Sequence, residues 1–268
     1  MNHCILITTV KNRADHFLKT FPLSTSQYGI SYEISLVDFY SNDGFYDHLK
    51  KQISFRKEAF SPFLKKINYI KLLKDLKFNP RKAKNLGSSY HKNKTGQPKN
   101  ILAFNDADVL LGMTYLEFWS NKIRAKESFL ATRTQETRAS LPRRLATEIN
   151  YGNLIAHSED FFAINGFDEN VGHYGGDDDD LYHRLKLYGL KEINPYSPLD
   201  ARQFSILHGD DLRVSQLEDP RRVEKEKAFD KIFKNQDFLA KDSNFLNLPY
   251  SMKISTLETL YDKEISKS

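Results

Sequence analysis

The feature that most constrains the fold is the order of the first three segments of the chain. Residues 3–10, HCILITTV, form a continuous apolar run rich in β-branched side chains, which is typical of a strand buried on both faces of a parallel sheet. Residues 11–21 place apolar side chains at helical spacing, and residues 32–40, YEISLVDFY, indicate a second strand. Strand, helix and strand with short connections predict a βαβ unit and an α/β fold with a mostly parallel sheet.

Later segments continue this alternation of strands and helices. Strands or extended segments are predicted at residues 99–111, 127–136, 204–209 and 248–257, and a strand followed by a short helix at 153–167. Basic amphipathic helices are predicted at 46–77, broken at Pro62, and further helices at 79–93 and 114–125. No internal repeat or linker interrupts the pattern, so a single domain over residues 1–268 is expected.

Composition limits the cellular setting. Cys4 is the only cysteine, which excludes an intramolecular disulfide and favours a reducing compartment, and its place in a predicted buried strand favours a core role. No apolar run approaches the ~18 residues that span a bilayer. The first residues lack the basic leader, long apolar stretch and cleavage site of a signal peptide. A cytoplasmic protein is therefore expected.

Positive charge is concentrated between Lys51 and Asn100. The chain has a formal net charge of +5, and within this stretch only Glu58 and Asp75 oppose the many Lys and Arg residues. Such a stretch can attract nucleic acid, an anionic membrane surface or a phosphorylated ligand. For most of these lysines, however, we prefer the simpler interpretation of a solvated helical face.

Two carboxylates follow the apolar run ILAF, residues 101–104, in the predicted strand at 99–111. In the sequence FNDADVLL, Asp106 and Asp108 stand two residues apart directly after an apolar run. Ligands of open α/β sheets collect beyond the carboxyl ends of the strands. Carboxylates at that place suit a hard divalent cation that carries phosphate oxygens, such as Mn²⁺ or Mg²⁺. A DxD pattern is common by chance, and its position after a buried strand is what gives it weight.

Four consecutive aspartates follow two glycines in the stretch GHYGGDDDDLYHRLKLYGL, residues 172–190. The apolar residues after them predict a helix, so the aspartates occupy its first turn, where negative charge is favoured. Helix capping accounts for one or two acidic residues but not for all four. Crowded carboxylates raise one another's pKa, which makes a general base for a sugar hydroxyl plausible.

A histidine near the end of the late strand at 204–209 is a third candidate. His208 follows FSIL and precedes Gly209. A histidine at a strand end is more often a hydrogen-bonded structural residue than a ligand. Together with a DxD motif, however, its imidazole can complete a Mn²⁺ site that carboxylates begin.

Taken in order, these motifs resemble those of GT-A glycosyltransferases, and most closely the β-1,4-galactosyltransferase family and the bacterial chondroitin-polymerase type. Residues 151–185, YGNLIAHSEDFFAINGFDENVGHYGGDDDDLYHRL, are similar to the family's strand, helix, NGF and GWGGEDDDxxxRL stretch. TVKNRADHFLKTFP resembles its first nucleotide-binding turn, NPRKAKNLGSSY its R-x-x-N-x-G segment, FNDADVLL its DxD strand and NFLNLPYSM its closing strand. Tyr174 stands where Trp is usual in the family, and Asp177 where Glu is usual.

The resemblance implies a role for each matching residue. It places the nucleotide-sugar at Thr9, Val10, Arg13, Asp38, Lys84 and Asp106. It places the metal at Asp106, Asp108 and His208, and the acceptor at Tyr174, Gly176, Asp177 and Asp179. Asp178 is implied as the catalytic base, and Asp180 is expected to cap the helix. Residues 1–110 would form the nucleotide-binding half and residues 111–268 the acceptor and catalytic half.

The implied reaction is a single displacement with inversion. It would move a sugar of the Gal, GalNAc, GlcNAc or GlcA type from a UDP-sugar to a hydroxyl of a glycan or lipid-linked oligosaccharide, with Mn²⁺ or Mg²⁺ as cofactor. The expected setting is bacterial surface polysaccharide synthesis, with a possible peripheral contact to an anionic membrane. Two alternatives remain: another metal-dependent nucleotide enzyme, such as a nucleotidyltransferase or phosphohydrolase, and a non-catalytic basic module that binds nucleic acid. Nucleic acid is not the expected partner, because that reading gives the aspartates no role.

Overall fold

The computed structural model describes residues 3–72, 79–95, 100–131, 153–170, 176–193, 197–206, 232, 234–243 and 252–257. Its strands are β1 (His3–Val10), β2 (Tyr32–Asp38), β3 (Leu64–Leu72), β4 (Asn100–Asp106), β5 (Val109–Leu111), β6 (Ser128–Ala131), β7 (Leu154–His157), β8 (Lys191–Ile193), β9 (Gln203–Ser205) and β10 (Met252–Leu257). Its α-helices are α1 (Ala14–Ser24), α2 (Phe45–Arg56), α3 (Pro80–Thr95), α4 (Tyr115–Ser120), α5 (Ser158–Ala163) and α6 (Asp177–Leu187). Short 3₁₀ turns η1 (Lys57–Ala59) and η3 (Leu199–Ala201) complete the set.

A mixed sheet forms the centre of the molecule. Within the described residues it has eight strands in the order β10-β3-β2-β1-β4-β7-β6-β8, while β5 and β9 form a separate pair. The neighbours β3, β2, β1 and β4 are parallel, and β7 and β10 run antiparallel to the strands beside them. The predicted α/β fold with a mostly parallel sheet is therefore confirmed.

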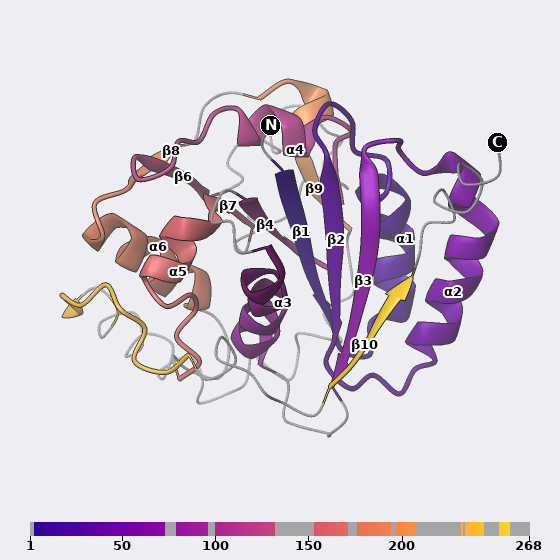
Figure 1. The fold of residues 1–268 in the computed structure, drawn as a ribbon, viewed down its shortest axis with the longest axis horizontal. Helices are drawn as coiled ribbons and strands as arrows, with labels where there is room; N and C mark the ends of the chain where they lie inside the picture. Colours follow the sequence, from indigo (N-terminus) through magenta and orange to yellow (C-terminus); the bar gives the residue numbers. More distant parts are fainter. Residues whose placement is uncertain are drawn as a thin grey trace.

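Helices cover both faces of the sheet, as Figure 1 shows with α1 and α2 on the right and α3, α5 and α6 on the left. Side chains alternate along β1, so Leu6 packs in one core cluster with α1, α2 and α4, whereas Ile5 and Ile7 pack in another with α5 and α6. Residues of α3 form a third cluster with β2 and β3. Burial on both faces explains why HCILITTV has no polar alternation.

The predicted helices over residues 46–77 are only half right. The first part is helical, because α2 extends to Arg56. The second part is not a helix but the strand β3, Leu64–Leu72. Ile67 packs on the α1 side of the sheet and Ile70 on the α3 side, so the strand is apolar on both faces. Lysines near its two ends, Lys65, Lys66 and Lys71, give the segment the composition of a basic helix. Neighbouring strands, which the local pattern does not reveal, decide the outcome.

Helix α3 lies directly against the sheet. A methyl group built on Gly87 would come within 2.8 Å of Ile7 Cγ2 and 3.0 Å of Val37 Cγ2. Only a residue without Cβ permits such a close approach of helix to strands. This contact fixes α3 over β1 and β2 and thereby fixes the position of Lys84, which lies one turn before Gly87.

Cys4 has no exposed surface, and burial raises the pKa of its thiol to about 12, which agrees with the predicted core role. Among the described residues, no helix combines the length and the apolar character needed to cross a membrane.

Candidate functional site

Three of the predicted site residues end neighbouring strands. Thr9 of β1 pairs in register with Asp106 of β4, and Val10 pairs with Asp38 of β2. Because the three strands are parallel, these residues lie at one edge of the sheet, the edge at which ligands of open α/β folds bind. The strand register thus brings Thr9, Asp38 and Asp106 together, and their assigned contact with a nucleotide-sugar stays a prediction.

Lys84 joins the two acidic motifs. Its Nζ lies 3.6 Å from Asp106 Oδ1 and 3.4 Å from Asp178 Oδ1, and only 3% of its side chain is exposed. The same ammonium group lies 5.3 Å from the centre of the Phe167 ring. A buried lysine requires compensating charge, and the two carboxylates supply it. Lys84 is therefore no part of a solvated helical face, and neither is Arg81, which is 1% exposed.

The second carboxylate of the DxD motif faces the first loop of the fold. Arg13, in the turn between β1 and α1, places NH1 3.6 Å from Asp108 Oδ2. The Asp108 side chain is 13% exposed and that of Arg13 is 33% exposed. Each acid of the motif thus lies beside one of the basic residues predicted to contact the nucleotide. An anionic diphosphate could be held by these two cations.

The two carboxylates also fit a divalent cation, since Mn²⁺ and Mg²⁺ favour oxygen ligands at a strand end. In the part of the chain that the structure describes, no group of three His, Cys, Asp or Glu side chains is arranged to hold a metal ion. The third predicted ligand, His208, lies outside the described residues. Asp106 and Asp108 are the two predicted metal ligands within the described residues.

Helix α6 begins at the first of the four aspartates, as predicted, after Gly176, whose positive φ of 77° suits glycine. Asp178 faces Lys84, and its side chain is 15% exposed. Asp179 is half-buried on the same turn. The side chain of Asp177, and the whole of Tyr174, lie outside what the structure describes. The aspartates are therefore not a uniform acidic turn.

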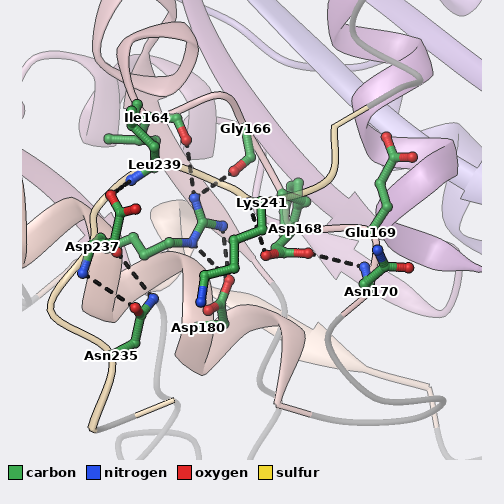
Figure 2. A network of polar contacts seen from close by, with 12 residues as sticks. Ile164, Gly166, Asp168, Glu169, Asn170, Asp180, Asn235, Asp237, Leu239 and Lys241 are labelled. Atoms are coloured by element: carbon green, nitrogen blue, oxygen red, sulfur yellow. Dashed lines mark hydrogen bonds and ion pairs between the residues drawn. The ribbon is translucent and has the colours of Figure 1, made fainter. Parts of the chain in front are cut away.

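Asp180 does not cap α6, so that prediction is wrong. It is 4% exposed and accepts a hydrogen bond of 2.8 Å from Nε of Arg184, one turn later. Arg184 has no exposed surface and donates through NH1 to the carbonyl groups of Ile164 (3.1 Å) and Gly166 (2.8 Å). Figure 2 shows Ile164 and Gly166 on one side of the guanidinium group and Asp180 on the other. No side chain caps the helix. The ion pair could have been predicted from the sequence, because Asp180 and Arg184 stand four residues apart on a predicted helix.

A buried asparagine ties α3 to the loop after α5. Asn85 accepts from the Phe167 amide (2.9 Å) and donates to the Phe167 carbonyl (2.9 Å) and to Glu169 Oε1 (2.8 Å). The next residues hold a later segment: Asp168 accepts from the Lys241 amide at 3.1 Å, as Figure 2 shows. The family resemblance assigned no role to Asn85. Its hydrogen bonds hold the segment around Phe167, which precedes α6 in the chain, against α3, the helix that carries Lys84.

Asp38 has both carboxylate oxygens engaged within the protein. Oδ1 accepts from the Ser41 amide at 2.7 Å, and Oδ2 accepts from the Tyr69 hydroxyl. The residue is 1% exposed. Burial and the bonded carboxylate both raise the pKa of Tyr69. Asp38 thus shapes the loop after β2.

Val10 is another buried member of the predicted set. Its side chain packs in the core cluster that includes α1, and its carbonyl accepts the Phe39 amide at 2.8 Å. Its neighbour Thr9 is 7% exposed.

Comparisons with known proteins match one segment of the sequence and the fold as a whole. A family model described as the N-terminal domain of galactosyltransferase matches residues 136–208, which include β7, α5 and the whole of α6 with its aspartates. No curated protein matches the chain.

Solved structures of several glycosyltransferases share the fold. One is the catalytic domain of Drosophila β1,4-galactosyltransferase 7 in complex with xylobiose, at 14% identity and a TM-score of 0.52, covering 85% of this chain and 81% of that one. Another is S. aureus TarS 1-349 in complex with UDP-GlcNAc, at 12% identity and a TM-score of 0.57, covering 87% and 65%.

A third is the mannosyltransferase PcManGT from Pyrobaculum calidifontis in complex with GDP-Man and Mn²⁺, at 15% identity and a TM-score of 0.53. The match covers 72% of this chain and 54% of that one, so the chain spans only about half of that protein. Together these matches confirm the predicted GT-A fold.

Proposed function

We propose that this chain, which has the GT-A fold of the glycosyltransferases, transfers a sugar from a UDP-sugar to a hydroxyl of a glycan acceptor with inversion at the anomeric carbon. The donor sugar is of the Gal, GalNAc, GlcNAc or GlcA type, and the acceptor is a glycan or a lipid-linked oligosaccharide. The family match over residues 136–208 and the UDP-GlcNAc complex of the similar TarS structure support a nucleotide-sugar donor.

One observation carries the proposal: Lys84 lies within 3.6 Å of Asp106 and within 3.4 Å of Asp178. Asp106 belongs to the DxD motif at the end of β4, and Asp178 to the aspartate run at the start of α6. A donor diphosphate beside the first acid and an acceptor hydroxyl beside the second would be neighbours. Close and oriented reactants are the largest requirement of a transfer between two substrates.

Asp178 is the proposed base. Its carboxylate accepts the proton of the acceptor hydroxyl as the hydroxyl oxygen attacks the anomeric carbon. The bond from that carbon to the UDP oxygen breaks on the opposite face, so the configuration inverts and UDP leaves. Lys84 holds the carboxylate by its ammonium group, and Asp179, with Tyr174, Gly176 and Asp177, is proposed to orient the acceptor.

Charge on the leaving UDP is matched by groups at the donor edge. Arg13 and Lys84 are proposed to contact the diphosphate, since each already lies beside a carboxylate of the DxD motif. Asp106, Asp108 and His208 are the proposed holders of Mn²⁺ or Mg²⁺. When bound, such a cation supplies positive charge next to the diphosphate oxygens.

The cellular role follows from the same assignment. We place the enzyme in the cytoplasm, in the synthesis of bacterial surface polysaccharide, with residues 1–110 serving the nucleotide and residues 111–268 the acceptor and the chemistry. The exposed lysines of the basic stretch, such as Lys51 and Lys57, are available for peripheral contact with an anionic membrane. Nucleic acid is not the expected partner, because Arg81 and Lys84 of that stretch are buried rather than displayed.

The proposal is tested by the product released from UDP-sugars. Slow donor hydrolysis requires no acceptor, so we expect Mn²⁺-dependent release of UDP from at least one of UDP-Gal, UDP-GalNAc, UDP-GlcNAc and UDP-GlcA, and loss of release in EDTA. Release of inorganic phosphate or pyrophosphate in place of UDP would instead indicate a phosphohydrolase or nucleotidyltransferase. Equal release with EDTA and with Mn²⁺ would contradict the metal assignment.

Replacement of Asp178 tests the base. With a suitable acceptor, Asp178→Asn should lower the transfer rate by roughly 10²- to 10⁴-fold, the usual contribution of a general base. UDP binding, measured by calorimetry, should persist, because Asn retains the size of the side chain and removes only the proton acceptor. Asp179→Asn is the matched control on the same turn and should raise KM for the acceptor more than it lowers kcat. Near-normal transfer by Asp178→Asn would place the base elsewhere.

A further inference from the structure

Two loops at the donor edge of the sheet are joined to each other by hydrogen bonds. The Asn12 amide donates to Ser41 Oγ at 3.0 Å, and the Asn42 amide donates to Asn12 Oδ1 at 2.9 Å. The Ala14 amide, at the start of α1, donates to Asp43 Oδ2 at 2.9 Å. The loop after β1 and the loop after β2 therefore form one connected rim.

Tyr40 lies at the centre of this rim in an unusual backbone conformation. Its φ is 64°, in the left-handed region that a bulky side chain rarely adopts. Both flanking amides are held, that of Phe39 by the Val10 carbonyl at 2.8 Å and that of Ser41 by Asp38 Oδ1 at 2.7 Å. The surroundings thus keep a tyrosine where glycine would fit without strain. Strain of this kind is concentrated at functional sites.

The ring of Tyr40 is left partly in water. The residue as a whole is 36% exposed. Two other tyrosine rings pack on each other instead: the ring centres of Tyr46 and Tyr69 lie 4.8 Å apart, and the Tyr69 hydroxyl donates to Asp38. A partly exposed aromatic side chain in a loop at the ligand edge of the sheet is suited to stack on a flat partner.

The strand order indicates which part of a ligand would meet that face. Asp106 and its basic neighbours mark the diphosphate end at β4, while Tyr40 follows β2, and β1 lies between these two strands. Two strand spacings amount to about 10 Å. The group at that distance from the diphosphate of a nucleotide, beyond the ribose, is the base.

We propose that the ring of Tyr40 is the stacking surface for the nucleobase of the donor nucleotide, and that the rim built by Asn12, Asp38 and Ser41 exists to hold it there. This assignment rests on the proposed use of a UDP-sugar and adds a specificity residue to that site. It also gives the strained backbone a purpose, because the left-handed conformation directs the side chain away from the position that an ordinary turn would give it.

The test measures binding of UDP and of inorganic pyrophosphate by calorimetry in the presence of Mn²⁺. Tyr40→Leu keeps an apolar side chain but has no aromatic face, and it should weaken UDP binding by about 5- to 100-fold. Pyrophosphate has no base, so its affinity should not change. Tyr40→Phe keeps the ring and should bind UDP as the parent protein does.

Two further variants separate stacking from stability. Tyr28 is 43% exposed and precedes β2 at the opposite edge of the sheet, so Tyr28→Leu is a matched control that should leave UDP binding unchanged. Tyr40→Gly suits the positive φ, so it should fold with a melting temperature near that of the parent and still lose UDP affinity. This variant keeps the test decisive if Tyr40→Leu fails to fold.

Three results would overturn the inference. UDP binding by Tyr40→Leu or Tyr40→Gly at the parent's affinity would show that the ring does not contact the base, and would leave the glycosyltransferase proposal intact. A parallel loss of UDP and pyrophosphate binding would show that Tyr40 supports the loop rather than the base. A parent protein that binds no nucleoside diphosphate would remove the proposed function and this inference together.

Discussion

The four aspartates at the start of α6 show how far adjacent residues of one type can differ. Asp178 faces a buried lysine at the proposed reaction centre, while Asp180 pairs with a fully buried arginine on the core side of the same helix. A helix turns by about 100° per residue, so residues two apart lie on nearly opposite faces. One acidic run therefore serves a site and a core at once.

Replacement of Asp180 should affect stability rather than chemistry. Asp180→Asn leaves the guanidinium group of Arg184 without its counter-charge in the core, and we expect a loss of about 3 kcal/mol in the free energy of unfolding. Chemical denaturation measures this loss. The expected cost exceeds the ~1 kcal/mol of a lost helix cap, because the charge left behind is buried.

Asp179→Asn supplies the control for Asp180, because Asp179 is only half-buried. It should change the free energy of unfolding by less than about 1 kcal/mol. If Asp180→Asn were as stable as Asp179→Asn, the buried ion pair would contribute nothing to the free energy of unfolding.

At the scale of elements, α3 connects the parts of the site. It rests on β1 and β2 through Gly87, carries Lys84 toward the carboxylates and holds the loop before α6 through Asn85. A shift of this one helix would move the donor and acceptor sides together.

A methyl group at Gly87 should displace α3. In an exposed helix, Gly→Ala stabilises by about 1 kcal/mol. Here the new Cβ would lie 2.8 Å from Ile7 Cγ2, so we expect Gly87→Ala to destabilise the protein by about 1–3 kcal/mol. Urea denaturation gives the free energy, and calorimetry with UDP shows whether Lys84 has moved.

A double mutant identifies the contact. Ile7→Ala removes the atom that meets the new methyl group, so Gly87→Ala should cost less in the Ile7→Ala background than in the parent protein. Equal costs in both backgrounds would mean that the clash is relieved elsewhere and that α3 is not held by this contact.

For the whole molecule, one sheet supports all of the cores. Leu102 of β4 packs on the α5 and α6 side and Ala103 on the α1 side, so the same strand belongs to both layers. If the sheet unfolded, the apolar side chains of both core layers would be exposed to water. Such sharing favours cooperative unfolding even though two functional halves are proposed.

Unfolding should therefore occur in a single transition. Trp119, the only tryptophan, is 4% exposed in α4 and reports on one layer by fluorescence, while far-UV circular dichroism reports on all helices. The two midpoints in urea should coincide, and UDP with Mn²⁺ should raise both equally. Separate midpoints would show that residues 1–110 and 111–268 fold as independent units.

The sequence alone determined the features that depend on near neighbours. Periodicity predicted β1, α1, β2 and α3, since each is a local pattern of apolar side chains. The rule that parallel strands end at one edge was enough to bring Thr9, Asp38 and Asp106 together. The motif order also led to the GT-A fold, which the structural matches confirm.

Tertiary structure decided everything that depends on distant residues. β3 is a strand in spite of its lysines because β2 and β10 pair with it on either side. Lys84 is buried because Asp178, which lies 94 residues away in the sequence, neutralises it, and Asp180 is a core residue because α6 turns it toward Arg184. The left-handed Tyr40 is fixed by strands and loops on both sides of it. Burial and charge pairing across such separations are properties of the packed chain, so no window of sequence contains them.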